Sequence, residues 1–330
     1  MKDKMINSVK IQGYVYEHSL EIRTVKSEKK TDGTPNPNFG KSYIGGKLKV
    51  QIDEDAQNIV EVEYTYVTPT TKTGAENRTY TALNTIITEN KTVMNAGKEG
   101  AIKVKIDTSL DLNDFFTNRN GTTDWELVSA RVYSGGFVTI VSSIDADVAA
   151  RNKIEADVLF TKGIEHEPDE ENNIPRYLEL EGAVFNYKKE ILPMKFNLYN
   201  SRGIDFILGE LEQGKPYFVK AIGHINNVNS SIRIEEESAW GEPIVKEITK
   251  TRKEVVIDNM AGVPYSFGEE GDLLSMEEVK KAKADREIKL AAEKNRAIEY
   301  QNSKNDLPFG NAQPKTATAT TVKNESFQLF

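Results

Sequence analysis

Residues 177–226 constrain the fold most, because the spacing of their apolar side chains is regular and changes partway along the stretch. In the first half, apolar and polar side chains alternate with a period of two, which is typical of strands that bury one face. Leu178 and Leu180 share one face of the first run, and Met194 and Phe196 share one face of the second. The pattern therefore predicts two antiparallel strands joined by a polar turn.

The second half of the stretch changes to helical spacing and then returns to alternation. Ile204, Ile207 and Leu211 suit one face of a short helix, and Gly214 follows as a helix-ending residue. Residues 217–224 alternate again and predict a further strand. Two strands, a short helix and another strand form the middle of a five-stranded OB barrel, whose helix lies between the third and fourth strands.

The N-terminal half shows the same order of elements. Apolar spacing predicts strands at residues 8–17, 47–52, 59–67, 101–106 and 127–133, with a short helix at 80–87. Ser134, Gly135 and Gly136 predict a hairpin before a last strand at residues 137–141. Residues 11–22 also match residues 180–191 in glycine, valine, glutamate and isoleucine, which suggests a short internal repeat.

These patterns predict a mainly β protein with two OB-fold-like barrels, a C-terminal helix and a disordered tail. Strands at 154–164, 242–257 and 263–267 would complete the second barrel. Ser275 is suited to cap the helix, and the last residues contain too few apolar side chains to fold. The predicted boundaries are 1–148 for the first barrel, 149–270 for the second, 271–300 for the helix and 301–330 for the flexible tail.

Composition narrows the class of protein. Charged residues make up 28% of the chain, and no apolar run approaches the ~20 residues that a membrane span needs, so we expect a soluble, cytoplasmic protein without a membrane partner. The chain has no cysteine and three widely spaced histidines, so we expect no cofactor and no metal site. The net charge of −8 argues against DNA binding over the whole surface but permits a local basic groove.

Sequence motifs for catalysis are absent: the chain has no phosphate-binding loop, no dinucleotide-binding glycine pattern and no nucleophile elbow. The run from Glu165 to Glu171, which includes His166, supplies ligands that would suit a hard metal ion. A run of charges is more commonly a solvated loop. We therefore predict no catalytic residue.

Outward-facing aromatic and basic residues accompany the predicted strands of both barrels. Single-stranded nucleic acid needs this mixture, because bases stack on aromatic rings and phosphates contact cations. The alternative is that these are ordinary strand-surface residues, with tyrosines that pack under loops. The candidate nucleic-acid-binding residues are Tyr14, Tyr16, Arg23, Lys26, Lys47 and Lys49 in the first barrel, and Tyr187, Lys188, Lys189, Lys195 and Tyr199 in the second.

Residues 194–224 resemble the strand–helix–strand segment of bacterial and phage single-stranded-DNA-binding proteins. The resemblance lies in Lys195-Phe-Asn-Leu-Tyr199, in the helix that follows, and in the run from Gly214 to His224. It implies that Lys195, Tyr199 and, less directly, Lys220 contact DNA. The whole chain resembles the long form of this family that occurs in phages and mobile elements.

The family also recruits replication and repair partners through a tail that ends in acidic residues and Pro-Phe. The resemblance implies a partner-binding role for Leu307, Pro308, Phe309 and Phe330. This chain departs from the pattern, because its Pro-Phe is internal and is preceded by one acidic residue.

The sequence therefore predicts a non-catalytic protein that binds single-stranded DNA with little sequence preference, in the DNA replication or recombination of a phage or mobile element. A β-rich structural protein of a virion is the alternative, because an acidic, cysteine-free chain with many polar loops suits it equally. A metal-dependent hydrolase that uses Glu165–Glu171 is a third, less favoured interpretation.

Overall fold

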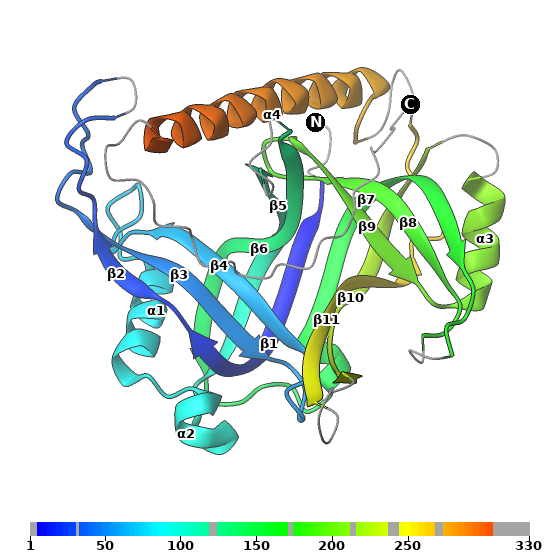
Figure 1. Ribbon diagram of the computed structural model, residues 1–330, viewed down its shortest axis with the longest axis horizontal. Helices are drawn as coiled ribbons and strands as arrows, with labels where there is room; N and C mark the ends of the chain where they lie inside the picture. Colours follow the sequence, from blue (N-terminus) through cyan, green and yellow to red (C-terminus); the bar gives the residue numbers. More distant parts are fainter. Residues whose placement is uncertain are drawn as a thin grey trace.

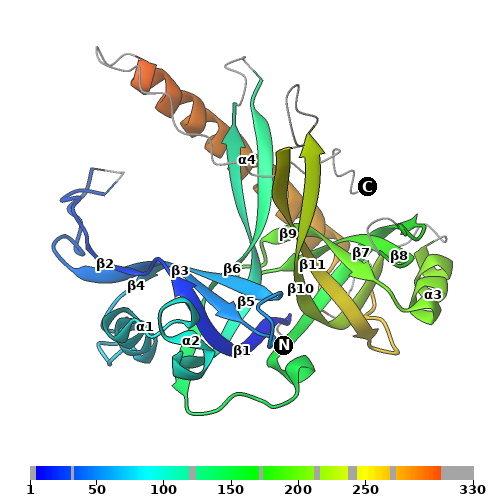
Figure 2. The same cartoon turned by 60° about the horizontal axis from the view of Figure 1, so that its bottom comes forward.

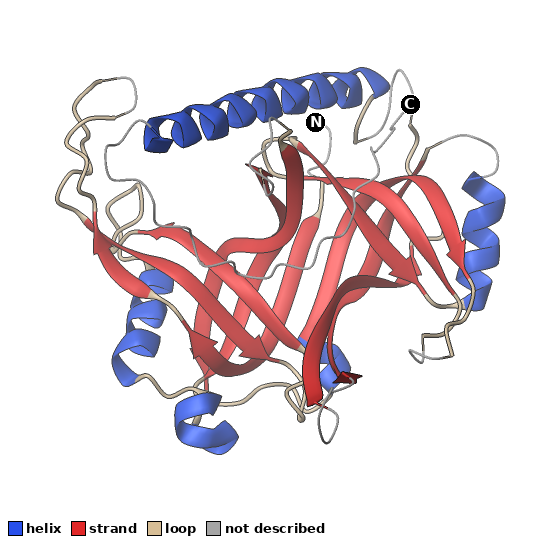
Figure 3. Ribbon diagram, in the orientation of Figure 1, coloured by secondary structure: helices blue, strands red, loops and turns tan. Residues whose placement is uncertain are grey.

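The computed structural model describes residues 5–30, 33–118, 124–170, 174–211, 216–236, 244–267 and 273–305. Within these residues the chain is mainly β, and one sheet of 11 strands coils into two barrels (Figure 1). The helices lie outside the barrels (Figure 3).

The first barrel closes in the OB order. Strand β1 pairs antiparallel with β3 and β5, β3 pairs with β4, and β5 pairs with β6. A short parallel contact of β4 with β6, at Val62 and Tyr133, closes the barrel. Its elements are β1 (Asn7–His18), β2 (Glu21–Thr24, on the edge of β3), β3 (Ser42–Gln51), β4 (Ile59–Val67), α1 (Arg78–Glu89), α2 (Val93–Gly100), β5 (Lys103–Thr117) and β6 (Glu126–Val141).

The second barrel repeats this topology. Strand β7 pairs with β8 and β10, β8 with β9, and β10 with β11, and a parallel contact of β9 with β11 at Asn197 and Val256 closes it. Its elements are β7 (Asn152–His166), β8 (Tyr177–Phe185), β9 (Ile191–Leu198), α3 (Ser201–Leu211), β10 (Tyr217–Glu236) and β11 (Ile244–Met260); a 3-10 turn, Val148–Arg151, precedes it. Each helical segment follows the third strand of its barrel, so the predicted fold of two OB-like barrels is confirmed.

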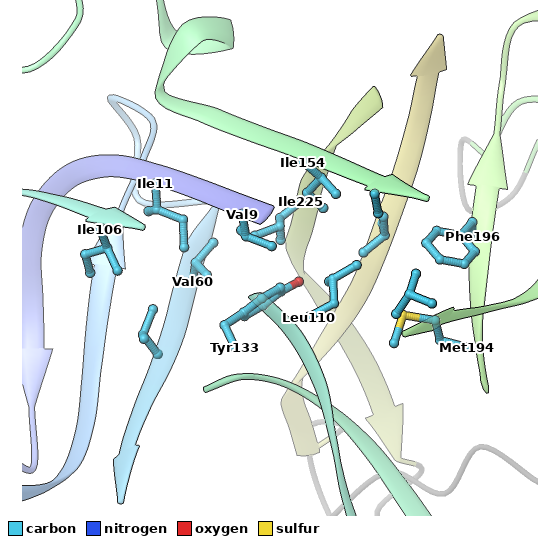
Figure 4. Packing of buried hydrophobic residues seen from close by; sticks show 14 of the residues in the cluster. Val9, Ile11, Val60, Ile106, Leu110, Tyr133, Ile154, Met194, Phe196 and Ile225 are labelled. Atoms are coloured by element: carbon cyan, nitrogen blue, oxygen red, sulfur yellow. The ribbon is translucent and has the colours of Figure 1, made fainter. Parts of the chain in front are cut away.

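Strand pairing and a common core join the two barrels. β1 pairs antiparallel with β7, from Asn7 opposite Ala156 to Ile11 opposite Asn152. One apolar cluster runs through both, and its members include Ile11 and Ile106 of the first barrel and Met194 and Phe196 of the second (Figure 4). The division into domains at residue 148 remains a prediction.

Asparagine side chains also bind the barrels to each other. Asn58 Nδ2 of the first barrel donates to the carbonyl oxygen of Ile225 on β10 at 2.9 Å. Within the second barrel, Asn152 Nδ2 on β7 donates to the same oxygen at 2.5 Å, and Asn152 Oδ1 accepts from the Ile225 amide at 3.1 Å. Asn227 Nδ2 donates to the carbonyl of Ile59 at 2.9 Å. β10 of the second barrel is thus hydrogen-bonded to the β3–β4 turn of the first.

We expect Asn152→Ala to lower the free energy of unfolding by ~1–3 kcal/mol, because it leaves the buried amide of Ile225 without its partner. Urea denaturation followed by circular dichroism measures this change. Gln57→Ala, at an exposed position of the β3–β4 turn, is the control and should change stability by less than ~0.5 kcal/mol. Equal effects of the two substitutions would contradict a stabilising role for the hydrogen bonds between Asn152 on β7 and Ile225 on β10.

Three details of the sequence interpretation are wrong. β6 continues through Gly135 and Gly136, which have φ values of 66° and 95° and form a bulge opposite Thr108, between the pairs Asp107–Phe137 and Ser109–Ser134, instead of a hairpin turn. Residues 263–267 form no strand; Tyr265 packs on Phe218 with ring centroids 5.1 Å apart. The repeat is not structural, because residues 11–22 lie in β1 and β2, whereas residues 180–191 lie in β8 and its turn into β9.

The C-terminal helix α4 (Met276–Asn305) lies across both barrels (Figure 1). Ser275 and Glu278 form a capping box, in which Ser275 Oγ accepts from the Glu278 amide and Glu278 Oε2 accepts from the Ser275 amide. Val279 is buried against a second cluster that includes Phe185. The predicted partner-binding residues Leu307, Pro308, Phe309 and Phe330 lie outside the described residues, as does the rest of the tail beyond residue 305.

Candidate nucleic-acid interface

OB folds bind oligonucleotides mainly on their second and third strands and on the loops beside them. These strands, here called the ligand strands, are β3 and β4 in the first barrel and β8 and β9 in the second. Of the predicted residues, Lys47 and Lys49 lie on β3, Lys195 lies on β9, and Tyr199 follows the end of β9.

An aromatic row crosses the second barrel beside its ligand strands. The rings of His166 and Tyr177 stack with centroids 4.5 Å apart and planes 7° apart, and Tyr177 and Tyr199 follow with centroids 5.4 Å apart. The three side chains come from the end of β7, the start of β8 and the residue after β9, and all are half-buried. Such a row offers ring faces on which successive bases can stack.

The buried carboxylate of Glu254 fixes one member of this row, Tyr199. Glu254 on β11 is 6% exposed, and its Oε1 accepts from Tyr199 Oη at 2.9 Å and from Asn197 Nδ2 at 2.7 Å. Burial, and then the charge of Glu254, raise the pKa of Tyr199 to about 12, so the phenol stays protonated and donates. Arg252 pairs with the same Oε1 at 2.9 Å and donates to Tyr199 Oη at 3.3 Å. Tyr199 therefore has a fixed hydroxyl and a partly exposed ring.

The first barrel also contributes to this region. β5 and β6 extend beyond their barrel as a long hairpin, here called the arm, which comprises residues 111–117 and 126–132 (Figure 2). Arg131 on the arm donates to the backbone oxygens of Lys195, at 3.2 Å, and Lys253, at 2.9 Å. A guanidinium of one barrel thus lies at the ligand strands of the other.

Six of the eight predicted cations have a carboxylate partner. Lys195 pairs with Glu179 at 2.8 Å across β8 and β9, Lys47 with Glu61 at 2.7 Å, and Lys49 with Glu17. The hydrogen bond that Lys47 donates to the Glu61 carboxylate raises the pKa of Lys47. The remaining pairs are Arg23 with Glu21, Lys189 with Glu278 on α4, and Lys220 with Glu155. These pairs are mostly half-exposed and therefore weak, so a phosphate can replace the carboxylate.

The other predicted residues are dispersed. Tyr187, 79% exposed in the β8–β9 turn, has the Lys188 ammonium 5.6 Å from its ring centroid. Tyr14 on β1 lies between Lys98 and Lys103, whose ammonium groups are 5.7 and 5.8 Å from its ring. Tyr16 is half-buried on β1, and Lys26 is exposed beyond β2. Lys195 lies on a ligand strand and Tyr199 directly follows it, whereas Tyr14 and Lys220 lie on strands other than the ligand strands.

Sequence reasoning missed several residues of this interface. In the first barrel, the rings of Tyr43 and Tyr66 contact each other at 4.6 Å, and Arg23 lies opposite Tyr43 on β2. In the second, Tyr177 and Arg252 were not predicted. An aromatic residue at the end of an alternating run, as at Tyr66 and Tyr177, is the signal that would have identified the tyrosines.

The acidic loop of the second barrel has no metal-site geometry in the part that is described. Glu165 forms a salt bridge with Arg176, and His166 stacks on Tyr177. No group of three potential ligands comes together among the described residues, and Glu171 lies outside them. A helix with the length and apolarity needed to cross a membrane is likewise not found in the described part of the chain.

The chain was compared with known proteins. Among solved structures it is similar to the wild-type single-stranded DNA binding protein from Thermus aquaticus, with 12% identity, a TM-score of 0.40, and coverage of 78% of this chain and 93% of that one. It is also similar to a Plasmodium falciparum SSB in complex with ssDNA, with 12% identity, a TM-score of 0.23, and coverage of 43% and 100%. The strand pairing, not these weak similarities, establishes the fold.

No curated protein matches the chain. The model of one protein family, YorF, matches residues 6–296, which include both barrels and two thirds of α4. A match over this much of the sequence establishes membership, and the chain therefore belongs to the YorF family.

Proposed function

We propose that this protein binds single-stranded nucleic acid, and DNA in particular, with little preference for sequence. The observation that carries the proposal is the aromatic row His166–Tyr177–Tyr199 beside Lys195 and Arg252, on the ligand side of an OB barrel. Rings that stack on bases and cations that contact phosphates accept any sequence. The first barrel offers a smaller counterpart in Tyr43 and Tyr66.

The resemblance found in the sequence supports a role in the DNA replication or recombination of a phage or mobile element, in the cytoplasm of the host cell. In this role the protein coats exposed strands and has no catalytic step. Leu307, Pro308, Phe309 and Phe330 are the proposed contacts for a replication or recombination partner. A structural protein of the virion is the rival, and it would be found in purified particles.

Titration of labelled single-stranded and double-stranded oligonucleotides, followed by fluorescence anisotropy at several salt concentrations, tests the proposal. We expect tight binding of the single strand, much weaker binding of the duplex, and a logarithmic loss of affinity with salt of ~0.7 per phosphate contacted. Equal affinity for both forms, or no binding to either, would exclude the proposed function.

The lysine–glutamate pairs lead to a further prediction. Glu179→Gln removes the carboxylate that competes with phosphate for Lys195. We therefore expect the affinity for single-stranded DNA to rise about two- to fivefold, which corresponds to the free energy of a solvent-accessible ion pair. Glu293→Gln makes the same change of charge in the exposed pair with Arg296 on α4 and should leave the affinity unchanged. An equal rise in both variants would show a general effect of net charge.

A further inference from the structure

Five neighbouring strands pass through both barrels without interruption, in the order β6–β5–β1–β7–β10 (Figure 1). Their inner faces supply the common core, for example Val9 and Ile154 (Figure 4). Their outer face, here called the shared face, lies on strands other than the ligand strands.

Strand register places lysines in neighbouring positions on the shared face. Lys10 on β1 is directly opposite Asp107 on β5 and Lys153 on β7. Lys105 and Lys103, also on β5, are opposite Gln12 and Tyr14 of β1. Side chains directly opposite one another in an antiparallel pair point to the same side of the sheet. The lysines of three adjacent strands therefore form one surface.

The charge of this surface is positive although the chain is acidic. Its solvent-accessible charged residues are five lysines and two carboxylates, one exposed and one half-buried, which gives +3 on a protein of net charge −8: Lys10, Lys103, Lys105, Lys153 and Lys220 against Asp107 and Glu155. Asp157 is covered and accepts from the Ile6 amide and Tyr265 Oη, and Asp145 and Asp258 border the face.

The lysines of the shared face are less neutralised than those of the ligand strands. One carboxylate, that of Glu155, forms salt bridges with two lysines, Lys153 at 2.7 Å and Lys220 at 3.6 Å. The lysines around Glu155 lower its pKa. Within the described ranges, no carboxylate lies at salt-bridge distance from Lys10 or Lys105. On the ligand strands, by contrast, Lys47, Lys49 and Lys195 each have a glutamate partner.

Repulsion between neighbouring lysines on the shared face lowers the stability of the fold, and a bound anion would relieve it. Lys10 and Lys153 are like charges directly opposite each other, which destabilises an antiparallel pair. Aromatic side chains accompany these charges: Phe137, opposite Asp107, is 75% exposed, and Tyr14 lies under the ammonium groups of Lys98 and Lys103. Cations mixed with exposed rings are the chemistry that single-stranded nucleic acid recognises.

We propose that the shared face is a second binding surface, which takes the phosphate backbone of a single strand that continues beyond the ligand strands. This inference rests on the proposed function and deepens it. A short oligonucleotide is held by the ligand strands alone, whereas a long one also contacts Lys10 and Lys105.

The test compares oligonucleotides of ~16 and ~60 nucleotides, since one OB fold covers at most ~16. The full chain with Lys10→Glu and Lys105→Glu should bind the long oligonucleotide about tenfold more weakly, with a salt slope smaller by ~1.4 for two lost phosphate contacts. Its affinity for the short oligonucleotide should not change. Lys280→Glu with Lys281→Glu makes the same change of charge on exposed positions of α4 and should alter neither affinity.

Each other outcome overturns one specific statement. If the wild-type chain binds neither oligonucleotide, the proposed function fails. If it binds both and the double variant binds the long one as tightly, only the second surface fails. Analytical ultracentrifugation detects a second copy of the chain on this face: a wild-type dimer that the double variant dissociates would also overturn the inference. If the charge reversals unfold the protein, the neutral substitutions Lys10→Gln and Lys105→Gln replace them. These should also lower the salt slope for the long oligonucleotide.

Discussion

Arg286→Ala should lower the free energy of unfolding by ~1.5–3 kcal/mol, because it removes a charged hydrogen-bond partner from a largely buried carboxylate. The guanidinium of Arg286 on α4 binds Asp114 on the arm through two contacts, Nη1 to Oδ2 at 2.8 Å and Nη2 to Oδ1 at 2.9 Å. The two side chains are 16% and 13% exposed, and Ser129 Oγ also donates to Asp114 at 2.6 Å. Without the arginine, the carboxylate of Asp114 keeps its desolvation cost and loses the opposite charge.

Urea denaturation gives the change in stability, and a double-mutant cycle with Asp114→Ala isolates the pair. The double variant should be more stable than the sum of the two single losses predicts, because no unpaired charge is left. Arg296→Ala, in an exposed pair with Glu293 on the same helix, is the matched control and should cost less than ~0.5 kcal/mol. A loss as small as the control's would mean that α4 does not stabilise the arm.

Replacement of both Tyr177 and Tyr199 by alanine should weaken the binding of single-stranded DNA by roughly 2–6 kcal/mol, because each ring on which a base stacks contributes ~1–3 kcal/mol. The salt slope should stay nearly constant, since neither ring contacts a phosphate. Lys195→Ala should instead change the salt slope, which should be smaller by ~0.7 because one phosphate contact is lost. Oligonucleotide titrations at several salt concentrations separate the two effects.

Two variants control for structural damage. Tyr199→Phe keeps the ring and loses only the hydroxyl, with its hydrogen bonds to Glu254 and from Arg252, so it should bind far better than Tyr199→Ala. Tyr300→Ala removes an exposed tyrosine on α4 and should not change the affinity. If the double alanine variant melts like the wild type and still binds DNA with full affinity, the bases do not stack on this row.

The order of elements could be predicted because it depends on local spacing. Leu178, Leu180, Met194 and Phe196 are all buried, as period-two alternation predicts, and Ile204 and Ile207 are the buried residues of α3. Barrel closure depends on contacts between distant strands, such as Val62 with Tyr133, for which no local pattern exists. The bulge at Gly135 and Gly136 looked like a turn because both features need positive φ values.

In the candidate site, too, local spacing predicts some residues, whereas others are placed by contacts between distant strands. Lys195 and Tyr199 could be placed on one side of a strand from spacing alone, and each side chain has a partner on a neighbouring strand, Glu179 on β8 for Lys195 and Glu254 on β11 for Tyr199. The residues that fix them, Glu179 and Glu254, lie 16 and 55 positions away in sequence. Their proximity follows from cross-strand register, which no single stretch of sequence contains.

The β1–β7 pairing fixes the position of the two candidate binding sites relative to each other. Two sites joined by a loose tether meet a common ligand at an effective concentration that depends on the tether's length. Here the connection is the sheet itself, so the spacing of the two sites is set by backbone hydrogen bonds between Asn7–Ile11 and Asn152–Ala156. Under the proposed function we therefore expect a rigid bivalent receptor: a single strand long enough to span both barrels would gain avidity with little loss of conformational entropy in the protein, and a shorter strand would gain none.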